Sequence, residues 1–317
     1  MIDYQQLLVN TKPYQALLAD KHNDRLGHCY MIISEDEIAC DSLCMMFARA
    51  ILCENDGCGD CLTCTKVENR SHAELKELTE YKMQDVQNFI DLAYYKVTEG
   101  KYKVMLIPAF DNIAEATQNV LLKTLEEPCE NVIFVLGVHK QSRVIDTIKS
   151  RAEKLYLERL DNQAISEVLL EEGNDEERVD RAVACAFGSL TKAKQLVADN
   201  EFVTDYATMI SILKEMKTSK DVVNMLDKLA LSKDNKLDKY LDVLEIILKA
   251  MLGWKNKTMT RGFEELRELG ENFNNAMLVN IFELVQECRR RLESNCKQEN
   301  LADMLLMGIL EVKYLCR

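Results

Sequence analysis

The fold of this chain is decided by the stretch from Gln118 to Arg151, QNVLLKTLEEPCENVIFVLGVHKQSRVIDTIKSR. Its first part, residues 118–127, places apolar side chains at helical spacing and predicts an amphipathic helix. Pro128 ends that helix, because proline lacks a backbone N–H and disfavours the helical conformation of the residue before it. The next run, residues 132–136, is short, continuous and rich in β-branched side chains, which predicts a strand buried on both faces of a parallel sheet. The stretch ends on a single arginine, which is a candidate functional residue.

The first half of the chain repeats this alternation of apolar runs and helical patterns. The expected strands lie at residues 29–34, 75–78, 102–107, 132–137 and 154–157, and the expected helices at residues 35–52, 83–97 and 113–127. Strands that alternate with helices form parallel sheets, since each crossover needs a helix-sized connection. The predicted fold class is therefore α/β, with a parallel sheet.

The second half of the chain shows helical patterns only. Beyond about residue 158 the strand pattern stops and short helices are expected. Long amphipathic runs follow at residues 221–253, 274–293 and 299–315. We expect three domains: an α/β domain over residues 1–158, a small helical domain over 159–198 and an all-helical domain over 199–317.

Composition and charge exclude some classes of function. The 317 residues carry a formal net charge of −13 at a pI of about 5.0, whereas a protein that binds DNA on its own usually has a basic excess. The basic run at 289–291 is expected to be a solvated or subunit-facing patch. No signal-peptide pattern and no membrane-spanning apolar run is visible. Twelve cysteines, mostly scattered, indicate a reducing compartment, so a cytoplasmic protein without a membrane partner is expected.

Four cysteines, Cys53, Cys58, Cys61 and Cys64, follow the spacing C-x4-C-x2-C-x2-C. A tetrahedral zinc site needs four thiolates at about 2.3 Å from the metal, and C-x2-C pairs in tight turns supply them. Glycines on both sides of Cys58 allow such turns. Reduced thiols or a redox pair are the alternative interpretation. A closed set of four thiolates leaves no open ligand position, so the expected Zn²⁺ is structural.

The turn after the first strand, SEDEIACDS at residues 34–42, lacks the chemistry of a phosphate-binding loop. Such loops are glycine-rich and end in Gly-Lys-Ser/Thr, so that amides and a lysine hold the phosphates. This turn has neither glycine nor lysine, and its four acids would repel a triphosphate. After a later strand, Pro108 and Ala109 stand where an acidic pair would hold magnesium, and neither can bind metal. The sheet is predicted to bind no ATP.

With these features the chain resembles the AAA+ subunits of bacterial replicative clamp loaders. The resemblance is carried by the cysteine module and by RLGH at 25–28, NVLLKTLEEP at 119–128, TIKSR at 147–151, GSLTKA at 188–193 and NLADMLL at 300–306. It covers nearly the whole chain. The family contains ATPase subunits, gamma/tau, with an intact phosphate loop and acidic pair, and subunits that lack a working loop. This chain resembles the second kind, which implies a degenerate AAA+ domain without intrinsic ATPase activity.

The resemblance implies that Arg151 acts in trans. It matches the arginine of the family's Ser-Arg-Cys motif, which enters the ATP site of the neighbouring subunit, although Ala152 replaces the cysteine. Thr191 lies near the position of a second-sensor arginine in the ATPase subunits. The resemblance further implies a lid at 159–198, a collar at 199–317 that assembles with gamma/tau and delta, and contact with the sliding clamp and primed DNA through the complex. The chain would then be an ATP-inert stator.

Two other functions fit parts of the sequence. An active clamp-loader ATPase of the gamma/tau type would have to bind nucleotide without a phosphate loop. A zinc-ribbon protein that binds nucleic acid would use the cysteine module, but the net charge of −13 disfavours it. Without the family resemblance, Arg151 would be interpreted as a surface cation.

Overall fold

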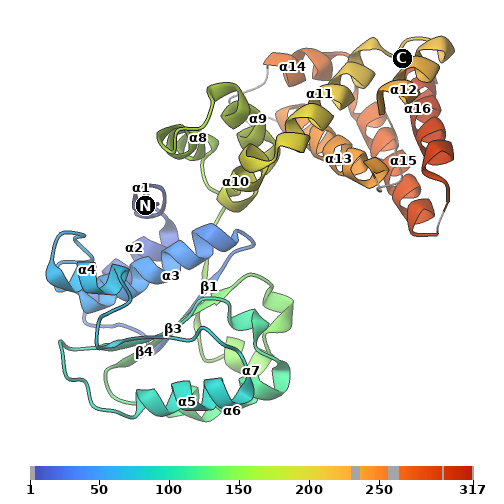
Figure 1. Ribbon diagram of the computed structural model, residues 1–317. Coiled ribbons are helices and arrows are strands. Elements are labelled where there is room, and N and C mark those ends of the chain that lie inside the picture. The colour runs from blue at the N-terminus through green and yellow to red at the C-terminus, as the bar shows by residue number, and fades with distance from the viewer. Residues whose placement is uncertain (1–3, 230–235, 256–263, 295, 316–317) are drawn as a thin grey trace. The chain divides into compact units, whose positions relative to one another are not determined.

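The computed structural model describes residues 4–229, 236–255, 264–294 and 296–315 (Figure 1). The chain forms two compact units. The first ends at Leu160 and also includes Ser189–Thr191, and the second contains Asp161–Gly188 and the chain from Lys192 onward. Each unit has its own apolar core, so each is described separately.

The first unit is built on a five-stranded parallel sheet with the order β2-β3-β4-β1-β5. The strands are β1 (Cys29–Ile33), β2 (Leu75–Glu77), β3 (Lys103–Ile107), β4 (Val132–Val138) and β5 (Glu153–Tyr156). All five expected strands are confirmed within a residue or so at their ends. The central strand β4 is buried along its whole length and pairs with β1 and β3. The α/β class with a parallel sheet is therefore confirmed.

Helices cover both faces of this sheet (Figure 1). One layer holds α1 (Gln5–Leu8), α2 (Lys12–His22), α3 (Glu37–Leu52) and α4 (Leu62–Glu68), and the other holds α5 (Met83–Ala93), α6 (Glu115–Glu126) and α7 (Asp146–Lys149). Short 3-10 turns, η1 (Phe110–Asn112) and η2 (Gln141–Arg143), follow β3 and β4. Alternate side chains of β1 enter the two layers: Tyr30 and Ile32 pack on the α3 side, and Met31 on the α5–α6 side.

Helix α5 is shorter than the expected helix at 83–97. It ends at Ala93, because the buried Lys103 donates from Nζ to Leu92 O at 3.1 Å and to Tyr95 O at 2.5 Å. A lysine that binds the last carbonyls satisfies acceptors that helix ends otherwise leave open. The following loop is held by Glu74, which accepts from the amide and the hydroxyl of Thr98, both at 2.7 Å.

The second unit is helical in all the parts that the structure describes. Its helices are α8 (Asn162–Glu171), α9 (Glu176–Ala186), α10 (Leu190–Ala198), α11 (Asn200–Glu215), α12 (Ser219–Leu229), α13 (Lys236–Lys255), α14 (Glu264–Glu271), α15 (Asn275–Glu293) and α16 (Gln298–Leu315). Residues 230–235 of the expected run at 221–253 lie outside the described residues. One apolar cluster contains side chains from each of the helices α11 to α16. Among the described helices, none is long and apolar enough to cross a membrane.

Gly137 in β4 makes the closest backbone approach in the sheet. A Cβ at this position would lie 1.9 Å from Pro108 O and 2.8 Å from Pro108 C. We expect Gly137→Ala to lower the free energy of unfolding by about 2 kcal/mol or more, because backbone has to move to relieve the overlap. Chemical denaturation measures this. Gly27→Ala is the control, since its Cβ would have ordinary contacts of 3.5 Å, and equal losses in both variants would contradict the prediction.

Candidate functional site

The four predicted metal ligands come together between α3 and α4. Cys53 follows the last turn of α3, and Cys61 precedes the first turn of α4. Cys53 Sγ lies 3.8 Å from Cys58 Sγ and 3.6 Å from Cys61 Sγ, and Cys58 Sγ lies 3.9 Å from Cys64 Sγ. All four sulfurs lie within 4.8 Å of one another, so the cluster could hold a metal ion.

The loop that carries these cysteines needs left-handed backbone. Asp56, Gly57 and Gly59 have φ values of 55°, 77° and 87°. At Gly57 a side chain has no room either, because its Cβ would lie 3.3 Å from Ala50 N on α3. Glycine adopts this conformation without steric cost, so the loop can close on the end of the helix and bring Cys58 back to Cys53.

The sulfur positions fit a tetrahedral thiolate site. Four sulfurs at about 2.3 Å from zinc would be roughly 3.8 Å apart, which the observed spacings match. Backbone amides donate to the sulfurs, from Asn55 N to Cys53 Sγ at 3.3 Å and from Cys64 N to Cys61 Sγ at 3.4 Å. Against the effect of burial, such amides lower the pKa of Cys53 to about 6. These donors favour the thiolate that binds metal.

Two cations accompany the cluster. Lys21 donates to Ala50 O at 2.8 Å and Cys53 O at 2.5 Å, and pairs with Asp56 at 2.9 Å. Arg49 is only 6% exposed, and its Nε and Nη2 atoms are buried without a hydrogen-bonding partner among the described residues. A buried guanidinium needs an anion nearby, and a metal–tetrathiolate is one. The residues present therefore fit a metal ion.

The turn at 34–42 is closed by the protein's own oxygens. Asp36 caps α3 and accepts from Ala39 N at 3.1 Å. Ser34 Oγ accepts from Asp36 N at 3.1 Å. Thr191 Oγ1 accepts from Ile38 N at 2.8 Å and donates to Asp36 Oδ1 at 2.5 Å. These amides at the start of a helix are the groups that hold phosphate in nucleotide-binding loops.

Asp36 also fixes the segment that carries Thr191. Its carboxylate accepts from the backbone N–H groups of Leu190 and Thr191, the second at 3.2 Å. Asp36 is 8% exposed. A buried carboxylate is stable only when hydrogen bonds satisfy it, and four donors from two helix starts do so here. The structure thus places Thr191, near the predicted second-sensor position, in contact with the turn at 34–42, which lacks the residues of a phosphate-binding loop.

The carboxyl edge of the sheet holds a buried polar cluster beyond Pro108 and Ala109. Asp111 accepts from the backbone N–H groups of His139 and Lys140, both at 3.0 Å. The Asp41 carboxylate lies 3.4 Å from His139 Nε2 and, with Cys40, raises the pKa of His139 to about 10. Ligands of parallel α/β sheets bind at this edge, and here protein groups occupy it.

Arg151 lies two residues beyond the end of α7, in the first unit. Its Nη1 donates to Thr147 O at 2.7 Å, and its Nη2 pairs with Glu126 Oε1 at 2.5 Å. The side chain is 31% exposed, and that of Glu126 48%. Gln118 sets the position of this segment from α6, because its buried amide donates to Arg143 O at 2.8 Å and accepts from Ile145 N at 3.0 Å.

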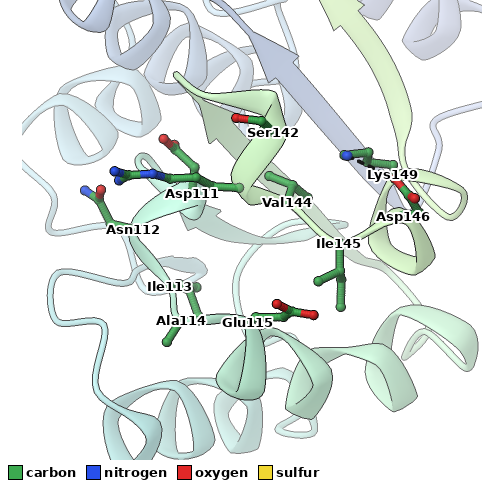
Figure 2. A pocket seen from close by; sticks show the side chains of 11 residues that line it. Asp111, Asn112, Ile113, Ala114, Glu115, Ser142, Val144, Ile145, Asp146 and Lys149 are labelled. Atoms are coloured by element: carbon green, nitrogen blue, oxygen red, sulfur yellow. Dashed lines mark hydrogen bonds and ion pairs between the residues drawn. The ribbon is translucent and has the colours of Figure 1, made fainter.

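A polar hollow of about 650 Å³ lies between the starts of α6 and α7 (Figure 2). Acidic side chains of Asp111, Glu115 and Asp146 line it together with the basic Arg143 and Lys149. Arg151 is not among its lining residues. With both signs of charge on its walls, the hollow does not select an anion such as phosphate, and we assign no ligand to it.

The chain is similar to known DNA polymerase III subunits. A family model described as DNA polymerase III, delta subunit, matches residues 9–161. DNA polymerase III subunit delta' of Bacillus subtilis is 23% identical over 91% of this chain and 92% of its own length. DNA polymerase III subunit tau/gamma of Haemophilus influenzae is 31% identical, over 49% of this chain and only 23% of its own length. A solved Bacillus subtilis DNA clamp loader delta protein aligns over 94% of this chain and 99% of that chain, with 11% identity and a TM-score of 0.38.

A parallel sheet of order β2-β3-β4-β1-β5, followed by helical regions, places the chain in the AAA+-like class of clamp-loader proteins. Within that class, residues 9–161 match the family model described as DNA polymerase III, delta subunit, and the chain is similar over nearly its whole length to a DNA polymerase III subunit delta'.

Sequence patterns located some of these groups and missed others. The four cysteines were recognisable from their spacing, the turn at 34–42 and Pro108-Ala109 from the residue types they lack, and Arg151 from the family resemblance. Asp36 as the central acceptor, Gln118 as a support and Arg49 as a buried cation were not recognised. An acid in a turn, a glutamine in a helix and an arginine in a helix have no local signal for burial.

We expect one zinc per purified chain and its loss in Cys58→Ser and Cys61→Ser, because each variant removes one of four thiolates. The melting temperature should fall by roughly 5 °C, for a lost metal contribution of about 2 kcal/mol. Elemental analysis and thermal denaturation, with and without chelator, measure this. Cys296→Ser is the control, since Cys296 is exposed and outside the cluster. A wild-type chain with far less than one zinc would count against the site.

Proposed function

We propose that this chain is an ATP-inert stator of the bacterial replicative clamp loader that supplies Arg151 to the ATP site of a neighbouring gamma/tau subunit. The observation that supports this best is the occupied start of α3. Asp36 and Thr191 take the amides that would hold a phosphate, while Arg151 stays accessible on another segment of the same unit. Similarity to a DNA polymerase III subunit delta' gives this arrangement its context.

The proposed inability to bind ATP follows from competition for the backbone amides at the start of α3. A triphosphate would have to displace Thr191 from Ile38 N, and would then face the carboxylate of Asp36 at close range. Like charges at such a distance repel strongly in a partly buried site. No lysine stands in the turn to offset this, and Pro108 and Ala109 offer no metal ligand. Binding energy for ATP is therefore lacking on both sides of the site.

The arginine is suited to act in trans. A guanidinium is permanently charged and planar, and it can hold two phosphate oxygens at once. In the free chain Arg151 is engaged by Thr147 O and by the half-exposed Glu126. A neighbour's γ-phosphate would replace Glu126 as its anionic partner. In related phosphoryl-transfer systems such an arginine contributes roughly 10³–10⁵ in rate.

Further parts of the proposal concern the rest of the chain. Zn²⁺ bound by the four cysteines would fix the loop after α3, and the residues at 159–198 and 199–317 would be a lid and a collar. The collar would assemble with gamma/tau and delta, and the complex would place the sliding clamp on primed DNA in the cytoplasm. The run at 289–291 pairs with acids of its own unit, Arg289 with Asp242 at 2.8 Å for example, so it adds little support for direct DNA binding.

The isolated chain is expected to show no ATP binding at micromolar concentrations and no ATP hydrolysis. Side chains of the protein already bind the amides at the start of α3, and Pro108 and Ala109 stand where magnesium-binding acids would be needed. Titration calorimetry with Mg²⁺–ATP measures binding, and a gamma/tau subunit in the same buffer is the positive control. Binding or turnover by the isolated chain would instead support an active ATPase. Tight, salt-sensitive DNA binding by the isolated chain would support the nucleic-acid-binding alternative.

We expect Arg151→Ala to leave the assembled complex intact and to slow hydrolysis at the adjoining ATP site by about 10³ or more. Arg151→Lys should restore only a small part, since lysine cannot make the bidentate contact. The measurement is clamp- and DNA-stimulated ATPase of a reconstituted complex, with assembly checked by size-exclusion chromatography. Arg143→Ala is the matched control, because this exposed arginine lies on the segment before α7. Unchanged ATPase and clamp loading in Arg151→Ala would refute the role.

A further inference from the structure

Arg49 has a position that the proposed function does not use. It lies in the last turn of α3, and its carbonyl oxygen accepts from the N–H of the first metal ligand, Cys53, at 2.9 Å. One helical turn therefore carries both a predicted ligand and a guanidinium. Its side chain is buried, at 6% exposure, beside a loop whose cysteines are partly open to solvent.

The guanidinium lacks an anionic partner within the described protein. No acidic side chain of the described residues forms an ion pair with Arg49, and its Nε and Nη2 are buried without an acceptor. The other cation of this region, Lys21, differs, because it pairs with Asp56 and donates to two carbonyls. A buried charge without a counter-charge is costly, so the guanidinium of Arg49 would be stabilised by an anion nearby.

Tyr14 contacts the loop that carries the cysteines. Tyr14 Oη donates to Asp56 O at 3.1 Å, and a Cβ at Gly57 would lie 3.4 Å from Tyr14 Oη. Burial raises the pKa of Tyr14; Arg49 lowers it, whereas Asp56, Cys64 and Cys53 raise it further. The charges of Arg49 and of two of the four cysteines thus act on the same hydroxyl.

We infer that Arg49 is the buried counter-charge of the metal centre and raises its affinity for zinc. Four thiolates around Zn²⁺ carry two net negative charges, and the centre is partly buried. A fixed guanidinium beside it stabilises the thiolates without becoming a ligand, as groups outside the ligand set do at other metal sites. This inference rests on the proposed zinc occupancy.

The test compares the metal affinity of the full chain and three variants at one pH. Arg49→Met keeps the length of the side chain and removes the charge, and Arg49→Lys keeps a charge. Arg70→Met is the control, because Arg70 is exposed and has its own anionic partner, Glu77, at a distance of 2.5 Å. Zinc affinity is measured by competition with a chromophoric chelator, and Co²⁺ substitution reports the four-thiolate ligand set by its absorption spectrum.

We expect Arg49→Met to weaken zinc binding by about tenfold or more, Arg49→Lys to recover most of the loss, and Arg70→Met to match wild type. The Co²⁺ spectrum should still report four thiolates in every variant. In chelator, Arg49→Met should melt no lower than wild type, since the buried charge then has no anion to meet.

Other outcomes separate the two proposals. A wild-type chain that holds no zinc refutes the metal site itself. A zinc-bound wild type with unchanged affinity in Arg49→Met, or with equal loss of stability in the metal-bound and metal-free forms, refutes the role of Arg49 alone. If Arg49→Met does not fold, Arg49→Gln and Arg49→Lys decide in the same way: equal affinities in these two variants overturn the inference.

Discussion

The carboxylate of Asp36 is the contact on which the rest of the first unit's functional edge depends. It accepts from a backbone amide of α3, from two backbone amides near residue 190 and from the hydroxyl of Thr191. In a nucleotide-binding relative of this fold, a phosphate would satisfy the donors at the start of this helix. Here a side chain satisfies them permanently, so the helix start needs no ligand to be stable. The proposed inability to bind nucleotide and the local stability of this edge would have the same cause.

The neighbouring edge of the sheet is organised in the same way. Where metal-binding acids would follow β3, the chain turns through Pro108 and packs that backbone against Gly137 of β4. Asp111, in the 3-10 turn η1 that follows, accepts hydrogen bonds from the backbone amides of His139 and Lys140 just after β4. The Asp111 carboxylate at this edge is thus engaged within the protein. A sheet edge of this kind can still act as a rigid support for neighbouring segments.

The sequence predicted those parts of the structure that depend on local patterns. All five strands were recognisable because each is a short apolar run between turn residues, and the cysteine cluster was recognisable from its spacing. The end of α5 was not, because it is set by Lys103, a residue of the next strand. The partnership of Asp36 and Thr191 joins positions 155 residues apart, which no periodicity reports. Arg49 looks like any helical arginine until its burial and the absence of an acceptor are known.

The pairing of Arg151 with Glu126 allows the arginine to be both positioned and available. An ion pair between partly exposed side chains contributes only about 0–1 kcal/mol, so exchanging Glu126 for a phosphate costs the chain little. The backbone that carries the arginine is held more firmly, because the buried Gln118 is hydrogen-bonded to residues on both sides of the turn before α7. Because this backbone is already ordered, little backbone entropy is lost when a second subunit binds the side chain. That combination is what the proposed action of Arg151 in a neighbour's ATP site requires.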